Sequence, residues 1–337
     1  MRVTLEDIAR LTNVSKATVS RVINGNEKGV GEETRKRILE AMERLDYRPN
    51  LLARGIASGK TRTIGIVVPD ITSPFFPEVI RATGDYLHSE DYIALICNTN
   101  LSPKMEEACL ASLIAKRVDG VILTSLFEEW QEIHERLNKY GIPCVLLDRK
   151  MKRMPVETGV FVDNEFSMFM ATEMLIRGGH RRIGFIAGPQ HASTTRERAQ
   201  GYRAALEAYQ IPYDDSLTYY GEFSIQCGYN AAMALMQDNQ GCTALLAGND
   251  TLAIGVLRAL KTLRIRIPQD VEMIGFDRSQ LTDVAEPPLS LIEQPTADLG
   301  EQVASLLFTL LRGEEPRERI LRLESRILLR GTTRNVG

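Results

Sequence analysis

A stretch near the N-terminus, VSKATVSRVINGN, brings two cations and three hydroxyl groups together at helical spacing. The guanidinium of Arg21 can donate two parallel hydrogen bonds to the edge of a guanine. The ammonium of Lys16 can reach a purine or a phosphate, and Ala17 can only touch a thymine methyl group or leave space for one. Hydroxyl groups suit phosphate oxygens, which set register without reading sequence, and this role is assigned to Ser15, Thr18 and Ser20. The alternative is that Lys16 and Arg21 are solvated charges on a helix.

Three short helices are predicted to position these side chains. Thr4 and Asp7 have the spacing of a capping box at the start of the first helix. Ser15 can cap the second helix, which ends at Asn24-Gly25, and the third covers residues 32–45. Helical spacing predicts a shared core of Leu5, Ile8, Ala9, Leu11, Ala17, Thr18, Val19, Val22, Ile23, Ile38, Leu39, Met42 and Leu45. This is a helix-turn-helix, whose second helix enters the major groove of DNA.

The charge distribution supports a nucleic-acid-binding head. Residues 1–62 contain 13 lysines and arginines against 8 aspartates and glutamates, whereas the rest of the chain contains 28 against 36. Clustered cations bind phosphates and release their counterions. The basic first part and the acidic remainder therefore indicate a DNA-binding unit joined to a body with a different task.

The body alternates apolar, β-rich runs with segments of helix length. The runs are TIGIVVP, YIALICN, DGVILTS, PCVLLD, GVFVD, RIGFIAG, TALLAG, VEMIGFD and LSLIEQ. Nearly continuous apolar strands predict parallel sheets covered on both faces. About nine such strands exceed one comfortable sheet, so two doubly wound lobes are expected.

Ligands of open α/β sheets bind beyond the carboxyl ends of the strands. The polar residues at those positions are Asp70, Ser73, Asn98, Thr124, Ser125, Asp148, Arg149, Asp163, Asn249, Asp250 and Asp277. Aspartate and asparagine at strand ends also cap the following helices. Each of these residues is therefore either a structural cap or a ligand contact.

Several classes of protein are disfavoured by what the sequence lacks. The five cysteines form no CxxC pair and no metal-type spacing with the histidines, so they are expected to be reduced and mostly buried, with no metal or cofactor. No P-loop or nucleophile elbow is present, and the GxG at 29–31 follows no strand, which argues against an enzyme. The first residues lack an apolar signal core, and no apolar run reaches the roughly 18 residues of a membrane helix. A cytoplasmic protein without a membrane partner is expected.

Long segments of the chain closely resemble the lactose/galactose repressor family of bacterial transcription regulators. The first are TLEDIARLTNVSKATVSRVINGN and TRKRILEAMERLDYRPNLLARGIA. The resemblance continues through TRTIGIVVPDITSPFF, RVDGVIL, FVDN, GHRRIGFIAGP, AGNDTLAIGVLRAL and VEMIGFD, and so spans nearly the whole chain. It implies an α/β fold in which a three-helix helix-turn-helix head precedes a two-lobed, doubly wound core like that of periplasmic sugar-binding proteins.

The resemblance also implies domain boundaries. Residues 1–48 are expected to form the helix-turn-helix domain, 49–61 a hinge helix and linker, and 62–337 the effector-binding and dimerisation core. The lobes of that core exchange strands near residues 161, 292 and 322. The expected N-lobe is about 62–161 with 293–321, and the expected C-lobe is about 162–292 with 322–333.

The resemblance further suggests which residues hold a ligand. Arg198 falls on the position that clamps a polyol or carboxylate, and Asn249 and Asp277 fall on positions that bind hydroxyl groups. Three phenylalanines match positions where an aromatic ring stacks on the ligand, although an aromatic side chain belongs more often to the core. Together with the strand ends, the predicted ligand contacts are Ser73, Phe75, Phe76, Thr124, Asp148, Arg198, Phe223, Asn249 and Asp277.

A short helix is predicted between head and body. Asn50 can cap a segment from Leu51 to Ala57, which is under two turns long and contains Gly55. Isolated helices below about 12 residues are marginal in water, so this one is expected to fold only when two copies pack in the minor groove. By resemblance, Ile56 then wedges a base step open; a plain linker is the alternative. The predicted DNA contacts are Thr4, Ser15, Lys16, Ala17, Thr18, Ser20, Arg21, Asn24, Asn50, Ala53 and Ile56.

These observations predict a ligand-responsive transcription regulator, namely a repressor of carbohydrate or sugar-acid catabolic genes. We expect it to bind a pseudo-palindromic double-stranded operator as a homodimer, because twofold symmetry in the protein requires it in the site. No apolar heptad tail follows the last expected strand, which favours a dimer over a tetramer. A small-molecule effector, a sugar, sugar acid or related compound, is expected between the lobes. The alternatives are an exported or cytosolic sugar-binding protein and a Rossmann-like enzyme without a DNA role.

Gly55→Ala is predicted to raise operator affinity and to weaken the response to the effector. Alanine favours the helix over glycine by about 1 kcal/mol, so the segment orders more readily. Operator titrations by fluorescence anisotropy, with and without effector, measure both effects. An unchanged affinity together with an unchanged response would indicate a passive linker.

Overall fold

The computed structural model describes residues 3–23, 29–47, 60–126, 131–151, 158–237 and 241–334. The chain forms two compact units, Met1–Thr61 and Arg62–Gly337. Each unit is described by itself. Of the predicted DNA contacts, Asn24, Asn50, Ala53 and Ile56 lie outside the described residues, as does the helix predicted for residues 51–57.

In its described residues, the first unit contains three helices around a small core. These are α1 (Leu5–Thr12), α2 (Lys16–Ile23) and α3 (Glu32–Arg44). The capping box predicted at the start of α1 is present: the backbone N–H of Thr4 donates to Asp7 Oδ2 at 2.9 Å, and the N–H of Asp7 donates to Thr4 Oγ1 at 3.4 Å. The centre of the core consists of Ile8, Ala9, Val19, Val22, Ile38 and Ala41.

Three of the predicted core positions in the head are wrong. Leu11, Ala17 and Leu39 are exposed. Each of these short helices buries only one narrow face, and the three residues lie beside it rather than on it. Ala17 was also predicted to face DNA, and its exposed position in the first turn of α2 is compatible with that role.

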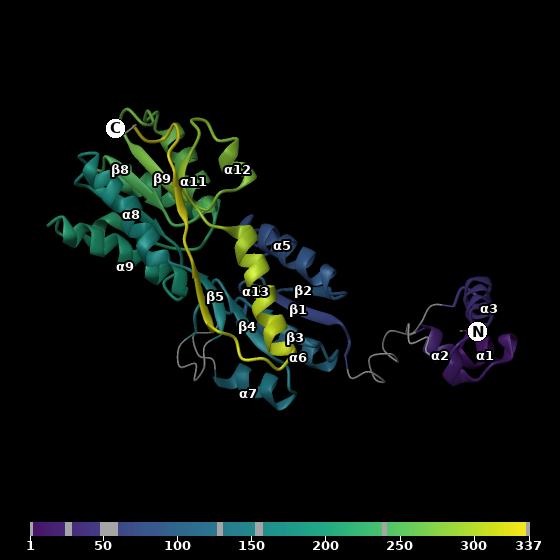
Figure 1. Ribbon diagram of the computed structural model, residues 1–337. Coiled ribbons are helices and arrows are strands. Elements are labelled where there is room, and N and C mark those ends of the chain that lie inside the picture. Colours follow the sequence, from purple (N-terminus) through teal and green to yellow (C-terminus); the bar gives the residue numbers. More distant parts are fainter. Residues whose placement is uncertain are drawn as a thin grey trace. The chain divides into compact units, whose positions relative to one another are not determined.

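The second unit contains two six-stranded sheets, one in each lobe (Figure 1). The first sheet has the order β11-β5-β4-β3-β1-β2, and all of its pairs are parallel. Its strands are β1 (Thr63–Val68), β2 (Ile93–Asn98), β3 (Gly120–Leu123), β4 (Cys144–Leu147), β5 (Gly159–Val162) and β11 (Ile320–Leu323).

The second sheet repeats this plan with the order β12-β10-β9-β8-β6-β7. Its pairs are parallel except that β12 runs antiparallel to β10. Its strands are β6 (Ile183–Ala187), β7 (Thr218–Tyr220), β8 (Ala244–Ala247), β9 (Glu272–Phe276), β10 (Ser290–Glu293) and β12 (Arg326–Leu328). The nine apolar runs of the sequence correspond to β1–β6 and β8–β10, while β7, β11 and β12 are additional strands that are half-exposed.

Helices cover both faces of each sheet. In the first lobe, α5 (Phe75–Ser89) and α13 (Thr296–Leu311) pack on one face, and α6 (Pro103–Ala115) and α7 (Gln131–Lys139) lie on the other. In the second lobe, α8 (Asn164–Arg177) and α9 (Ser193–Ala208) cover one face, and α10 (Ile225–Gln237) and α11 (Asp250–Thr262) cover the other. The short helices are Asp215–Leu217 and α12 (Gln280–Asp283). The central strands are buried on both sides, which explains their continuous apolar sequences.

The chain crosses between the lobes three times. It leaves the first sheet after β5, returns after β10 through α13 to β11, and leaves again for β12. Each lobe is therefore built from separate segments of the sequence. The crossings lie side by side next to the carboxyl ends of the strands, where a ligand of such sheets binds.

Helices α8 and α9 approach each other closely. A Cβ atom added at Gly201 of α9 would lie 2.0 Å from the backbone oxygen of Glu165 in α8, so only glycine fits there. This contact fixes two polar side chains, Asn164 at the start of α8 and Arg198 on α9, at a short distance from each other.

The five cysteines are unpaired, but the expectation that most are buried is wrong. Only Cys242 is buried, and the other four are half-buried; Cys97, Cys144 and Cys227 lie at the margins of the apolar cores. Among the described helices, none combines the length and apolar character that a membrane span requires.

Candidate functional site

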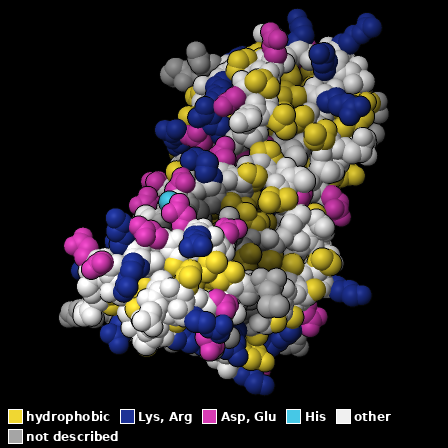
Figure 2. Space-filling model, turned by 90° about the vertical axis from the view of Figure 1, so that its right-hand side faces the viewer, with side chains coloured by type: hydrophobic (Ala, Val, Ile, Leu, Met, Phe, Trp, Pro, Cys, Tyr) yellow, Lys and Arg dark blue, Asp and Glu magenta, His cyan; other side chains and the backbone are white. Residues whose placement is uncertain are grey.

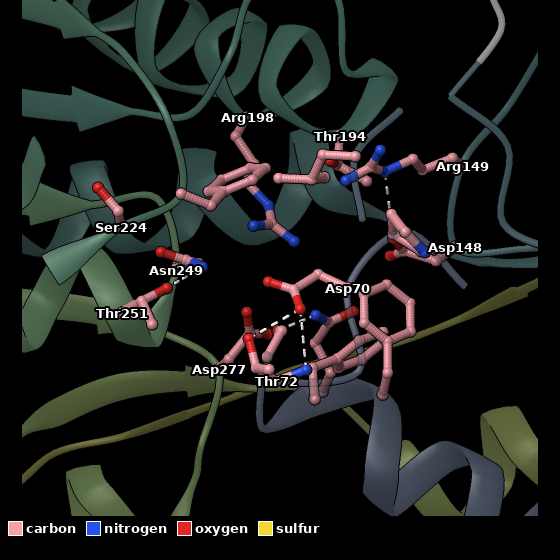
Figure 3. Close-up of a pocket in the computed structure, with 17 residues that line it drawn as sticks. Asp70, Thr72, Asp148, Arg149, Thr194, Arg198, Ser224, Asn249, Thr251 and Asp277 are labelled. Carbon is pink, nitrogen blue, oxygen red and sulfur yellow. Dashed lines mark hydrogen bonds and ion pairs between the residues drawn. The ribbon is translucent and has the colours of Figure 1, made fainter. Parts of the chain in front are cut away.

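A cavity of about 320 Å³ lies between the two lobes, at the carboxyl ends of their strands (Figure 3). This volume is typical of small-molecule sites. Its lining consists of Pro69, Asp70, Thr72, Ser73, Phe75, Phe76, Leu101, Asp148, Arg149, Thr194, Arg198, Phe223, Ser224, Asn249, Thr251, Asp277 and Gln294.

The structure brings most of the predicted ligand contacts together in this cavity. They are Ser73, Phe75, Phe76, Asp148, Arg198, Phe223, Asn249 and Asp277. Thr124 is the exception. Its side chain is fully buried, and its hydroxyl donates a hydrogen bond to the carbonyl oxygen of Leu147 at 3.0 Å. Thr124 therefore ties the end of β3 to β4 and does not face the cavity.

Other strand-end residues also have structural partners. Asn98 accepts a hydrogen bond from the backbone N–H of Ile71 at 3.2 Å. Ser125 donates to the buried carboxylate of Glu106 at 2.6 Å. Asp163 caps α8 by accepting from the N–H of Phe166 at 3.0 Å. Asn249 has both roles, because its Oδ1 caps α11 while the residue also lines the cavity.

Arg198 is a buried cation in the cavity wall, and in Figure 3 its side chain points into the cavity. Its Nε donates to Asn164 Oδ1 at 2.8 Å, and its Nη1 donates to the carbonyl oxygen of Gly248. The guanidinium carbon lies 3.5 Å from the centre of the Phe276 ring. Within the described part of the chain, no hydrogen bond occupies Nη2, so this group is available to a ligand. Burial lowers the pKa of Arg198, and the nearby carboxylate of Asp277 opposes that effect.

Two buried carboxylates face this guanidinium across the cavity. Burial raises the pKa of Asp277, whose Oδ1 accepts a hydrogen bond from Gln294 Nε2. Burial also raises the pKa of Asp148 to about 6, against the attraction of Arg149 and Arg198. Both aspartates have positive φ, 65° for Asp148 and 71° for Asp277, at the sharp turn that ends each strand. The cavity therefore offers strong hydrogen-bond donors and acceptors in an environment shielded from water.

Arg149 is a second buried cation in the lining. Its Nε lies 4.0 Å from Asp148 Oδ2 and has no hydrogen-bond partner in the described part of the chain. Burial lowers the pKa of Arg149. A buried donor without a partner carries a desolvation cost that a ligand oxygen can remove.

Some lining residues were missed by the sequence analysis. Arg149 was recognised as a strand-end residue but was not included in the ligand set. Gln294 follows β10 directly, so the strand-end rule applied to LSLIEQ finds it. Thr72, Thr194, Ser224 and Thr251 lie in loops or in first helical turns, where the sequence alone carries no distinguishing signal.

The predicted DNA-reading residues of the head are exposed on α2, Lys16 and Ala17 in its first turn and Arg21 in its last turn. Ser15 Oγ accepts a hydrogen bond from the N–H of Thr18 at 3.1 Å and lies 2.9 Å from Thr18 Oγ1, so it caps the helix as predicted. Two further predicted contacts differ in their setting: Ser20 is half-buried, and the hydroxyl of Thr4 donates to Asp7 at 2.7 Å within the capping box.

Comparison with known proteins identifies the class to which this arrangement belongs. Residues 4–50 match the family of bacterial regulatory proteins of the LacI type. Residues 61–327 match the periplasmic binding proteins and sugar-binding domain of the LacI family. The chain belongs to the LacI family and is a ligand-responsive transcription regulator. A sugar-binding protein or enzyme without a DNA role is not favoured, because the matched head is that of DNA-binding regulators.

Relatives match over nearly the full length of the chain. Catabolite control protein A of Priestia megaterium is 35% identical over 335 residues, which cover 99% of this chain and all of the relative. The structure of the transcriptional regulator CelR–cellobiose complex is 33% identical, with a TM-score of 0.75 over 98% of this chain and 100% of that one. The lac repressor dimer bound to operator and the anti-inducer ONPF has a TM-score of 0.88 at 25% identity, over 99% of both chains.

Arg21→Ala is predicted to reduce discrimination between operator sequences by roughly 1 to 3 kcal/mol per half-site, because a two-hydrogen-bond contact with a base is lost. The operator is first selected from a random-sequence DNA pool, and affinities are then measured for it and for single-base variants. Arg10→Ala, an exposed cation on α1, is the matched control. Equal weakening on every sequence would assign Arg21 to a phosphate instead.

Proposed function

We propose that this chain binds a pseudo-palindromic operator as a homodimer, and that a neutral sugar in the cavity between the lobes changes its operator affinity. The observation that supports the ligand most directly is that the lining of one cavity holds the buried guanidinium of Arg198 together with the hydrogen-bonded side chains of Asp277 and Gln294. We also propose the domain boundaries and the DNA contacts given by the sequence, with action in the cytoplasm and without turnover of the ligand.

The balance of charges favours a neutral ligand over a phosphorylated one. The lining contains three carboxylates, those of Asp70, Asp148 and Asp277, and two guanidinium groups, those of Arg149 and Arg198. A phosphate dianion would add negative charge to a site whose cations already face carboxylates, at a large desolvation cost. Hydroxyl groups can instead donate to the carboxylates and accept from the guanidinium groups without adding charge.

Aromatic rings in the lining support a sugar in particular. Phe75 and Phe76 stand edge to face with centroids 5.1 Å apart at the start of α5, and Phe223 comes from the opposite lobe. The C–H face of a sugar ring can pack on such surfaces, while its hydroxyl groups reach the polar wall. The relative CelR has been solved with cellobiose, which supports a carbohydrate here.

Exposed apolar residues support a second copy of the chain as partner. In the first lobe, Ile93 is 60% and Ile96 46% exposed on the edge strand β2. In the second lobe, Leu281 is 47% and Val284 80% exposed in and after α12. Apolar side chains also gather at the surface in the space-filling view (Figure 2). Apolar surface of this kind in both lobes suits an interface that spans the length of the core, and the lac repressor has been solved as a dimer on operator.

Arg198→Ala is predicted to weaken binding of the sugar at least about 30-fold, because the buried acceptors facing the guanidinium lose their partner. Thermal-shift screening of neutral mono- and disaccharides, sugar acids and sugar phosphates first identifies the sugar that wild type binds most tightly. Calorimetry then measures its affinity. Arg196→Ala, on the same helix but bonded to the carbonyls of Gln190 and His191, should leave binding unchanged. A preference for sugar phosphates, or normal binding by Arg198→Ala, would refute this part of the proposal.

Ile96→Asp combined with Val284→Asp is predicted to give a monomer in sedimentation velocity, because a buried charge is introduced into each half of the interface. Operator affinity should fall by about 100-fold or more, since two linked binding units gain avidity. Tyr140→Asp, which alters another exposed apolar side chain after α7, should remain dimeric. A dimer that persists in the double variant would place the interface elsewhere.

A further inference from the structure

Lys150 and Glu197 join the two lobes directly beside the cavity. Lys150 follows β4 in the first lobe, and Glu197 lies on α9 in the second. Lys150 Nζ is 2.6 Å from Glu197 Oε1, and the backbone N–H of Lys150 donates to Ser193 Oγ at 3.0 Å. The two charged side chains are only 26% and 17% exposed. The pair is therefore less screened by salt than an exposed surface pair.

The same carboxylate is connected to the guanidinium that faces the ligand. Glu197 Oε2 accepts a hydrogen bond from Asn164 Nδ2 at 3.1 Å. Asn164 Oδ1 in turn accepts from Arg198 Nε at 2.8 Å. Asn164 is buried, and its amide is held at both ends, since the nitrogen must face the carboxylate and the oxygen must face the guanidinium. An unbroken series of contacts thus runs from Lys150 of one lobe to Arg198 of the other.

We propose that Glu197 is a positioning residue, which orients Arg198 through Asn164 and, through Lys150, stabilises the arrangement in which the two lobes are close. This inference rests on the proposed function, in which Arg198 contacts the sugar. The Lys150–Glu197 pair forms only when the lobes are close, and the cavity is complete only in that arrangement. The pair and the ligand therefore stabilise the same lobe arrangement, so each strengthens the other.

The competing explanation is an ordinary ion pair with little energetic effect, as is usual at protein surfaces. Two features of this pair differ from that case. It connects two separate lobes, and the second oxygen of its carboxylate accepts a part-buried hydrogen bond from Asn164, which in turn contacts Arg198. Removing the pair should therefore change ligand binding, which an isolated surface pair would not do.

The first test measures affinity for the neutral sugar identified above. Lys150→Met should weaken it about tenfold, within the range of coupling energies between contacting residues, and should reduce the sugar-induced change in operator affinity. Lys150→Arg, which preserves the charge, should bind within about twofold of wild type. Glu173→Gln is the control, because Glu173 is about as exposed as Glu197 but pairs with Arg177 of its own helix α8 and makes no contact between the lobes in the described part of the chain. Wild-type affinity and response in Lys150→Met, or an equal loss in Glu173→Gln, would overturn the inference.

A charge-swapped double variant, Lys150→Glu with Glu197→Lys, distinguishes the two contacts of Glu197. It restores an ion pair between the lobes but places a donor opposite the donating nitrogen of Asn164. Amide hydrogen exchange of peptides covering 144–151 and 190–200 should be faster in Lys150→Met than in wild type, even without ligand. In the charge-swapped variant it should match wild type. The affinity of the charge-swapped variant for the sugar should nevertheless stay below that of wild type. Full recovery of affinity would remove Asn164 from the mechanism.

The exchange measurement also distinguishes this inference from the proposed function. If wild type binds no sugar, the proposed function fails, while faster exchange in Lys150→Met still supports the pair as a contact that closes the lobes. If wild type binds sugar but exchange in Lys150→Met is unchanged in both segments, the inference fails and the proposed function remains.

Discussion

A guanidinium buried between two lobes is the constraint on which the cavity depends. Burying a cation is costly unless hydrogen bonds, a ring face or carboxylates compensate, and Arg198 has all three. Its partners are Asn164 from α8, the carbonyl of Gly248 after β8, the ring of Phe276 in β9 and the carboxylate of Asp277. These partners come from different helices and strands. The need to satisfy one buried charge therefore constrains where several of these elements end. The close approach of α8 and α9 at Gly201 then becomes a requirement of the site as well as of the core.

The two polar surfaces of the chain differ in a physically meaningful way. On the head, Lys16 and Arg21 are exposed, so they can meet a polyanion without losing much hydration beforehand. In the cavity, Arg149 and Arg198 are buried and already face carboxylates. Under the proposed function, arginine therefore serves a long charged partner on the head and a small polar ligand in the cavity. Whether the side chain is buried, rather than its residue type, decides which kind of partner it can bind.

Much of the fold could be read from the sequence because parallel strands buried on both faces require continuous apolar runs, such as those of β1 and β9. The strand-end rule found Asp148 and Asp277, but it also selected Thr124, whose hydroxyl is used by the neighbouring strand. Arg198 lies in a helix and was found only by resemblance. The amide of Asn164 escaped both routes, because its importance comes from two contacts made in three dimensions. In the head, periodicity gave the helices correctly but overestimated the width of the face that each one buries, as Leu11 and Leu39 show.

The three crossings between the lobes have a consequence for biosynthesis. The sheet of the first lobe is covered on one face by α13, through Leu299, Val303 and Leu307, and is completed at its edge by β11. Both elements follow almost the whole second lobe in the chain. During translation, the first sheet therefore lacks the part of its cover that α13 provides, and its edge partner β11, until the chain is nearly complete. A chain that ends before α13 therefore leaves apolar surface of the first sheet exposed to water, which favours aggregation.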